Sequence, residues 1–274
     1  MSDATPAASR GATWLSALTG GAAEVPGGPP SLRAVDAPLG AEPARFLAVV
    51  PDPAARFPRA RHGEVGIEEG WGLARSVREV LRECGPPRPI VAVVDVASQA
   101  YGRLEELLGI HLACAAAVDA YASARAAGHP VVALLVGRAM SGAFLAHGYQ
   151  ANRILALDDP GVLVHAMGKA AAARVTRRSV AELDALGERV LPMSYDVRAL
   201  ARLGLVDRLV AGVDADAPSG ADVAKVRGEL VEAVRAARAG PRDLGRRLDS
   251  EAARRNRSAT LEVRRRLALE WEAR

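Results

Sequence analysis

The chain has few of the residues on which several common kinds of site depend. Cys84 and Cys114 are its only cysteines, and they are far apart and belong to no CxxC motif. This pattern predicts neither a disulfide framework nor a zinc site, and it favours a reducing compartment. The five histidines show no HExxH motif or other ligand spacing, so we expect no catalytic metal.

Long apolar runs are also absent. No stretch approaches the roughly 20 residues that a helix needs to cross a bilayer. Residues 1–20 lack a basic start followed by a hydrophobic core, so they do not have the pattern of a secretory signal. We therefore expect a cytoplasmic protein without a membrane partner.

Lysine and aromatic residues are scarce. Lys169 and Lys225 are the only lysines, so the net charge of +4 rests on arginine, and aromatic residues make up 4% of the chain. Acidic and basic residues alternate along the sequence. Nucleic-acid binding needs clustered positive charge and, for single strands, aromatic platforms. The composition therefore favours an acidic or phosphate-bearing partner over nucleic acid.

Apolar runs that alternate with helical patterns indicate an α/β fold. Residues 89–96 (PIVAVVDV) and 130–137 (PVVALLVG) are nearly continuous apolar runs, typical of strands that are covered on both faces. A long helix is predicted between them, over residues 104–127. This order favours a largely parallel sheet.

The two ends of the chain differ from its middle in composition. Residues 1–45 are rich in Ala, Gly and Pro, and we interpret them as an irregular N-terminal arm that only Trp14, Leu15 and Leu18 can anchor. Residues 216–274 are rich in Arg and Glu at helical spacing, which predicts a C-terminal helical extension.

The segment Gly137 to Gly148 (GRAMSGAFLAHG) is a turn of small residues between a predicted strand and a predicted helix. Ser141 and Gly142 begin that helix, whose first amides have no acceptor within it and can stabilise negative charge on a substrate oxygen. Ser141 has two interpretations. The nucleophile motif requires glycines two residues to each side, where this chain has Ala139 and Ala143. We therefore favour Ser141 as a small residue that caps the helix.

A second loop follows the preceding strand, over residues 95–102 (DVASQAYG). Ligands of α/β sheets collect at the carboxyl ends of parallel strands, so both loops can present amides to one substrate. His147 lies two turns beyond the glycine turn, and His165 belongs to a strand-like run over 162–167. Either histidine can reach a pocket between these loops.

Two motifs carry a family likeness: SQAYGRLEELLGIH, which begins at Ser98, and GRAMSGAFLAHG, which begins at Gly137. With the residues around them, from about Val91 to Val210, they resemble the gamma subunit of biotin-independent malonate decarboxylase. More distantly, this stretch is similar to the alpha half of acetyl-CoA carboxylase carboxyltransferase. The resemblance implies an α/β fold of the crotonase type (ClpP/crotonase), a spiral of ββα units, over residues 46–215, with helical terminal arms.

The activity that this resemblance implies belongs to a hetero-oligomeric complex. With a beta subunit of the same fold, the chain is expected to decarboxylate a malonyl group that an acyl carrier protein holds on its CoA-like prosthetic group. The products are the acetyl thioester and carbon dioxide. No cofactor is expected to bind the chain directly, and no biotin is needed. The carboxyltransferase pattern has a Pro-Gly pair where this chain has Ser98 and Gln99, which favours the decarboxylase.

The resemblance also implies roles for residues of both loops. The amides of Gly142 and Ala143 are expected to form one oxyanion hole, and those near Tyr101 and Gly102 the other. Loss of carbon dioxide leaves an enolate with its charge on the thioester oxygen, so amides aimed at that oxygen drive the reaction. The side chains expected to contact the substrate are those of Ser98, Gln99, Ser141, His147 and His165.

Two other functions fit the sequence. The chain could be a carboxyltransferase subunit of a biotin-dependent acyl-CoA carboxylase or decarboxylase, which moves a carboxylate between a biotin carrier and an acyl-CoA. It could also be a scaffold without catalysis, whose arginine-rich surface docks an acidic carrier protein.

Overall fold

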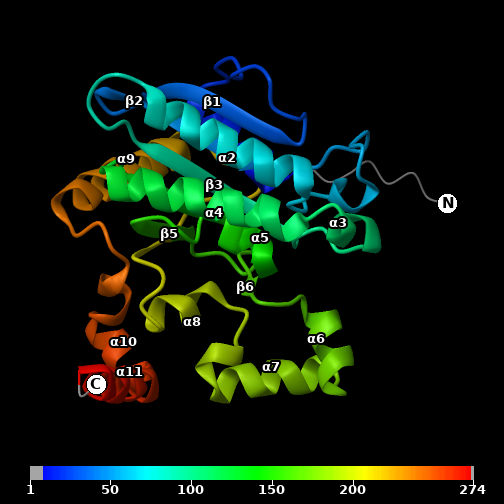
Figure 1. Cartoon of the computed structure of the whole chain (residues 1–274), viewed down its shortest axis with the longest axis vertical. Coiled ribbons are helices and arrows are strands. Elements are labelled where there is room, and N and C mark those ends of the chain that lie inside the picture. Colours follow the sequence, from blue (N-terminus) through cyan, green and yellow to red (C-terminus); the bar gives the residue numbers. More distant parts are fainter. Residues whose placement is uncertain (1–8, 273–274) are drawn as a thin grey trace.

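The computed structural model describes residues 9–272, which form a mixed sheet between layers of helices (Figure 1). The strand order is β1-β2-β3-β4-β5-β7, and β6 pairs with the carboxyl end of β4. β1 and β2 are antiparallel, and the other described pairs are parallel. The predicted α/β fold is confirmed. The strands are β1 (Leu32–Leu39), β2 (Glu42–Val49), β3 (Ile90–Val96), β4 (Val131–Met140), β5 (Arg153–Leu157), β6 (Val164–His165) and β7 (Arg208–Val210).

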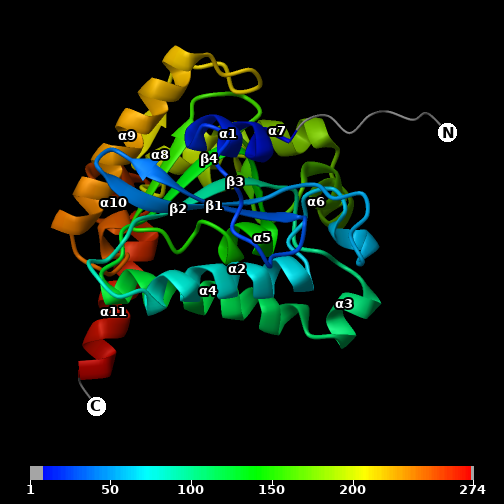
Figure 2. The same cartoon turned by 90° about the horizontal axis from the view of Figure 1, so that it is seen from above.

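Helices cover both faces of the sheet (Figure 2). α2 (Ile67–Arg82) and α4 (Ile110–Ala127) lie side by side on one face, and α1 (Arg10–Thr19) and α9 (Gly220–Ala239) lie on the other. Because both faces are covered, β3 and β4 bury almost all of their side chains, as their continuous apolar runs predict.

The interpretation of residues 1–45 as an irregular arm is wrong for the described part, 9–45. These residues form α1 and β1, and β1 is the edge strand of the sheet. Trp14, Leu15 and Leu18 lie in the main hydrophobic core. The glycines and prolines of this segment mark turns and an edge strand, where proline is tolerated because its missing N–H costs no ladder bond.

The helix predicted over 104–127 is two helices. α3 (Arg103–Leu107) ends before Gly109, and α4 begins at Ile110. The φ of Gly109 is +83°, a left-handed conformation that glycine adopts without steric cost. The chain therefore turns between the two helices, and the leucines of α3 and of the first turn of α4 stay on the surface.

A helical hairpin follows β6. It consists of α6 (Lys169–Thr176) and α7 (Val180–Arg189), and α8 (Val197–Arg202) then leads back to β7. α7 begins with a capping box, in which Ser179 and Glu182 each bond to the other's backbone amide. The strand-like run over 162–167 contributes only the two residues of β6, because the chain leaves the sheet after His165.

The helices predicted in residues 216–274 are present. α9 packs against β4 and β5 with Val226 and Leu230 fully buried, so it belongs to the main core. α10 (Glu251–Asn256) and α11 (Ser258–Glu272) lie at the far end of the molecule from α2, and α11 has no buried residue (Figure 1). Short 3-10 helices span Pro58–Ala60, Leu191–Met193 and Gly245–Leu248.

Two structural observations concern the apolar runs and the cysteines of the chain. None of the helices in residues 9–272 has both the length and the apolar character that crossing a bilayer requires. Cys84 is exposed, Cys114 is partly buried, and both thiols are free.

Candidate active site

The carboxyl ends of β3 and β4 bring the two predicted loops together. Val96 pairs with Ala139, so the loop after β3 and α5 (Ser141–Ala146), which follows β4, begin at the same edge of the sheet. β6 adds a third side, because Met140 pairs with His165. Parallel strands thus place residues from three distant segments around one point.

A pocket of about 490 Å³ opens at this point. Five of the predicted site residues line it, and most of the rest of its wall is apolar. A mostly apolar lining with a few polar groups is typical of ligand pockets. The lining residues are Gln99, Tyr101, Ser141, Gly142, Phe144, Leu145, Tyr149, Val164, His165, Ala166, Pro192, Ser194, Leu200, Leu203 and Leu205.

Sequence reasoning missed the apolar wall. Leu200, Leu203 and Leu205 come from α8 and the turn after it, about sixty residues beyond α5. The helical spacing of 200 and 203 predicts that one face is buried, but it does not indicate which part of the molecule that face contacts.

Ser141 has a strained backbone. Its φ is +59°, and Arg177 is the only other non-glycine residue with positive φ among residues 9–272. A non-glycine residue in this region costs roughly 1–2 kcal/mol, so the packing around the turn must hold it there. The N-cap of α5 is Met140, and Ser141 is the first residue inside the helix. The prediction that Ser141 caps the helix is therefore wrong.

The hydroxyl of Ser141 contacts the pocket instead. Its Oγ lies 2.9 Å from the phenol oxygen of Tyr101, across the gap between the two loops. A serine nucleophile requires a base within hydrogen-bond reach. No histidine or carboxylate hydrogen-bonds to Ser141 within the described part of the chain, so the nucleophile interpretation gains no support.

Gly142 lies directly against the side chain of Gln99. A Cβ atom built at position 142 would overlap Oε1 of Gln99, so any larger residue there would displace the end of that side chain. The amides of Gly142 and Ala143 make no hydrogen bond to a group outside α5 in the described residues. α5 has only six residues, so any stabilisation of an anion here comes from these amides more than from a helix dipole.

The first loop contributes less than predicted. Tyr101 and Gln99 line the pocket, but Ser98 and Gly102 do not. The hydroxyl of Ser98 donates to the carbonyl of Gln99 at 2.7 Å, so it serves the loop's own backbone. A Cβ atom at Gly102 would overlap the carboxylate of Glu105, a buried residue of α3.

His165 is one of the residues that line the pocket. Its ring stacks on Tyr195 with centroids 4.0 Å apart, and the amide of Met167 donates to its Nδ1 at 3.3 Å. Burial lowers the pKa of His165, which favours the neutral ring. With Nδ1 accepting a hydrogen bond, we infer that the proton sits on Nε2, leaving one N–H donor.

His147 does not reach the pocket, contrary to our expectation. It is fully buried. Its Nδ1 lies 3.0 Å from the hydroxyl of Tyr121 on α4, and its Nε2 lies 3.1 Å from the carbonyl of Val93 on β3. Position 147 lies at the end of α5, where the side chain points into the core between sheet and helix.

The burial of His147 predicts a pH-dependent stability. Burial lowers the pKa of His147 to about 4, below the value of about 6.5 in an unfolded chain. As the pH falls through this range the unfolded chain takes up the proton first, so the free energy of unfolding should fall by up to about 3 kcal/mol between pH 6.5 and 4. Urea unfolding at several pH values measures this slope.

His147→Gln removes the titrating group and should flatten the slope in that range. The matched control is His111→Gln, because His111 is exposed on α4. An unchanged slope in His147→Gln would contradict the prediction.

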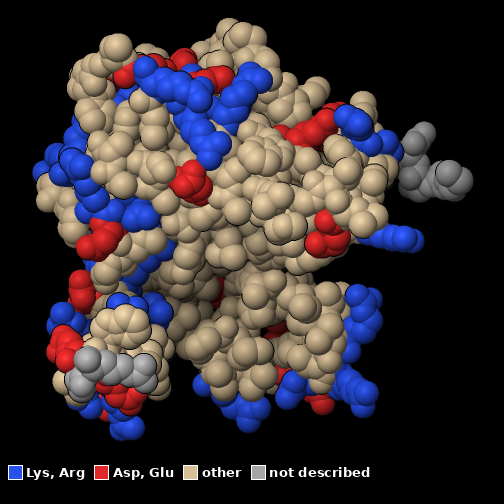
Figure 3. Space-filling view, viewed as in Figure 1, with Lys and Arg blue, Asp and Glu red and all other residues tan. Residues whose placement is uncertain are grey.

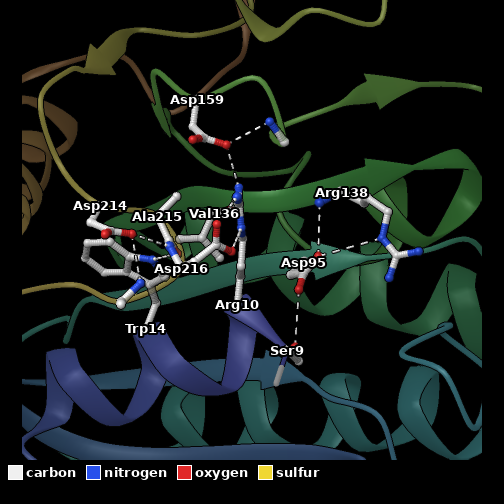
Figure 4. A network of polar contacts seen from close by, with 12 residues as sticks. Ser9, Arg10, Trp14, Asp95, Val136, Arg138, Asp159, Asp214, Ala215 and Asp216 are labelled. Carbon is white, nitrogen blue, oxygen red and sulfur yellow. Dashed lines mark hydrogen bonds and ion pairs between the residues drawn. The ribbon is translucent and has the colours of Figure 1, made fainter. Parts of the chain in front are cut away.

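A polar network joins the carboxyl ends of β3 and β4 to α1 (Figure 4). Asp95, near the end of β3, accepts hydrogen bonds from the amide of Arg138 at 3.0 Å and the hydroxyl of Ser9 at 3.2 Å. Arg10 donates to Asp159 at 2.7 Å and pairs with Asp216. The start of α1 thereby connects β3 to the loop after β5 and to the loop before α9. No motif in the sequence indicated this network.

Metal ligands are not gathered anywhere in the described residues. No group of three or more His, Cys, Asp and Glu side chains there is arranged to hold a metal ion. The candidate chemistry of this site is therefore that of amides, hydroxyls and one imidazole.

Sequence comparison gives one family and one curated relative. The profile of the malonate decarboxylase gamma subunit family matches residues 60–271. The malonyl-S-ACP:biotin-protein carboxyltransferase MADD of Malonomonas rubra is 35% identical over 165 residues, which cover 58% of this chain and 56% of that protein. The chain thus spans about half the length of this curated relative.

Solved structures give a closer match. A Pseudomonas malonate decarboxylase hetero-tetramer in complex with coenzyme A contains a chain that is 59% identical, with a TM-score of 0.90 over 96% of this chain and all of that one. A Pseudomonas malonate decarboxylase MdcD–MdcE hetero-dimer gives 58% identity and a TM-score of 0.88 over the same shares. Transcarboxylase 12S, at 20% identity and a TM-score of 0.59 over 77% of this chain and 36% of that one, shares the fold. The expected carboxyltransferase-type fold is confirmed.

Proposed function

The chain belongs to the malonate decarboxylase gamma subunit family, and from this premise we propose that it decarboxylates malonyl thioesters together with a beta subunit. The substrate is malonyl-S-acyl carrier protein, and the products are acetyl-S-acyl carrier protein and carbon dioxide. The observation that carries this proposal is the strained turn at Ser141, which brings the Gly142 amide beside Gln99 and Tyr101 in one apolar pocket.

Decarboxylation of a malonyl thioester requires that the site stabilise the negative charge of the enolate. The bond between the carboxylate carbon and the α-carbon breaks, its electron pair forms an enolate, and the thioester oxygen takes up the charge. A proton added to the α-carbon completes the acetyl thioester. Amides of Gly142 and Ala143 donate to the oxygen in this proposal, and they act most strongly at the enolate stage.

The other site residues have supporting roles in the proposal. Gln99 orients the acyl or carboxylate group, and the hydroxyls of Tyr101 and Ser141, 2.9 Å apart, face the same space. The neutral ring of His165 adds one N–H donor. The apolar wall keeps water away, which favours departure of the carboxylate as neutral carbon dioxide.

The chain carries a surface suited to the beta subunit. Leucines of α3 and the first turn of α4 are exposed beside Tyr101, and the side chain of Leu107 is exposed by 73%. Figure 3 shows few charges on the neighbouring face over α4 and α5. Contiguous apolar surface of this kind marks an interface. We propose that the beta subunit covers it and completes the pocket. The exposed side chains are Tyr101, Leu104, Leu107, Leu108, Leu112 and Leu145.

Reconstitution tests this proposal. The chain and its beta subunit together should release carbon dioxide from malonyl carrier protein, and neither should do so alone. Leu107→Arg places a charge in the proposed interface and should abolish assembly, with activity lost in parallel. Arg103→Leu, a change at an exposed neighbour on the same helix, is the control. Full activity of the chain alone would refute the shared site.

One observation favours a second function. The relative from Malonomonas rubra is a biotin-protein carboxyltransferase, so the chain could transfer the carboxylate to biotin rather than release it. Avidin would then inhibit the reconstituted reaction, and carboxybiotin would form. Insensitivity to avidin would support decarboxylation. A purely docking role would leave turnover unchanged by substitutions in both pocket loops.

A further inference from the structure

We propose that the tip of the α6–α7 hairpin is the docking surface for the carrier protein, on an acidic face of that partner. The tip comprises residues 174–180 (RVTRRSV), which we call the basic tip. This inference rests on the proposed function, because it requires that the malonyl group arrives on a carrier protein.

The basic tip combines free positive charge with apolar side chains. Arg174, Arg177 and Arg178 are exposed, and none of them makes a side-chain hydrogen bond or ion pair within residues 9–272. Val175, exposed by 67%, and Val180 lie among them. By contrast, Lys169 at the other end of the hairpin is already paired with Asp184 at 2.6 Å. Figure 3 shows basic side chains at the end of the molecule where α6 and α7 lie.

The hairpin is attached directly to the pocket. His165 and Ala166, which precede α6, and Pro192 and Ser194, which follow α7, all line the pocket. α6 has eight residues, so the basic tip stands about 12 Å from the end of the helix nearest the pocket. A carrier docked there would hold its prosthetic arm within reach of the pocket mouth.

The hairpin is built as a separate rigid unit. Ala172, Ala173 and Leu183 form a small hydrophobic cluster apart from the main core. The hydroxyl of Tyr195 donates to the carbonyl of Met167 at 2.7 Å, which ties the two attached ends of the hairpin together. The basic tip is therefore held in a defined position although it contributes nothing to the main core.

Arg177 provides a second, independent observation. It ends α6 in the left-handed conformation, with φ at +54°. Glycine or asparagine is the usual residue at such a position. A glycine would avoid roughly 1–2 kcal/mol of strain. An arginine at this position therefore lowers stability, and we infer that its charge is kept for contact with a partner.

Charge neutralisation of the basic tip in the beta–gamma complex tests the proposal. The variant is Arg174→Gln with Arg177→Gln and Arg178→Gln, which removes the three charges but keeps polar side chains and the strain at position 177. The KM for malonyl carrier protein should rise roughly tenfold or more and depend less on ionic strength, because docking charges have been removed. The kcat should stay unchanged.

The matched control neutralises three exposed arginines elsewhere. Arg82→Gln, Arg254→Gln and Arg264→Gln change the net charge by the same amount at exposed positions whose side chains make no hydrogen bond or ion pair in the described residues. A similar rise in KM in this control would show general charge attraction and overturn the docking site.

Two smaller substrates separate the possible causes. Malonyl-pantetheine carries the thioester without carrier or nucleotide, and its turnover should be the same in the variant and the unaltered complex. If malonyl-CoA turnover falls in the variant and carrier turnover does not, the basic tip binds nucleotide phosphates and the proposal is overturned. If the unaltered complex turns over no malonyl thioester, the proposed function has failed. Direct binding of the carrier protein to complex and variant then still tests the docking surface, and equal affinities overturn it.

Discussion

Replacing Gly142 by proline is expected to lower the kcat of the assembled complex by roughly 10²–10³, the usual effect of losing one oxyanion donor. Proline removes the amide hydrogen at the position where α5 begins. It also introduces atoms where Gln99 lies, since even a Cβ atom at 142 would overlap Oε1 of that side chain. Malonyl-carrier turnover at saturating substrate measures the effect.

Two variants separate the lost amide from the steric clash. Gly142→Ala keeps the N–H and displaces Gln99, so it reports the clash alone and should lose less activity than the proline variant. Gly220→Pro is the matched control, because residue 220 is also in the first turn of a helix and a Cβ atom there meets nothing within 4 Å. Circular dichroism and assembly with the beta subunit check that the proline variant folds. A folded Gly142→Pro complex with full activity would refute the role of this amide.

Replacing Trp14 by alanine is expected to cost about 3–5 kcal/mol of folding free energy, as for other large side chains in a close-packed core. Trp14 is fully buried, and α1 contacts β1, β2, β3 and β4. Its indole N–H donates to the carbonyl of Ala215 at 2.9 Å. Thermal melts at matched protein concentration should show a large fall in Tm.

Trp271→Ala and Trp14→Phe are the controls. Trp271 is exposed by 81% on α11, so Trp271→Ala should leave the Tm of the isolated chain nearly unchanged. Trp14→Phe keeps most of the packing but leaves the carbonyl of Ala215 without its partner, and should cost about 1–3 kcal/mol. Equal effects of Trp14→Ala and Trp271→Ala would show that α1 is a dispensable arm after all.

Prediction from the sequence succeeded where the evidence was local and periodic. The runs at 89–96 and 130–137 became β3 and β4 because continuous apolar residues suit strands covered on both faces. The capping box at Ser179 is a feature of the same local kind, since its hydrogen bonds join residues only three apart. The family motifs likewise lie in single short stretches of the chain.

Prediction failed where the outcome depended on distant partners. Composition made residues 1–45 look irregular, but Arg10 pairs with Asp216 and Trp14 donates to Ala215, both some two hundred residues away. His147 looked able to reach the pocket. The direction of its side chain was decided by Tyr121 and Val93, which close around it in the core.

The sequence alone determined the fold class, the family and the two loops that meet at the pocket, because strand periodicity and motifs are properties of neighbouring residues. Only the tertiary structure decided which side chains of those loops line the pocket. It turned Ser98 to its own backbone, aimed Ser141 at Tyr101, and placed Leu200 of α8 in the wall of the same pocket as Ser141. Side-chain direction follows from packing between segments far apart in the chain, and no local pattern records it.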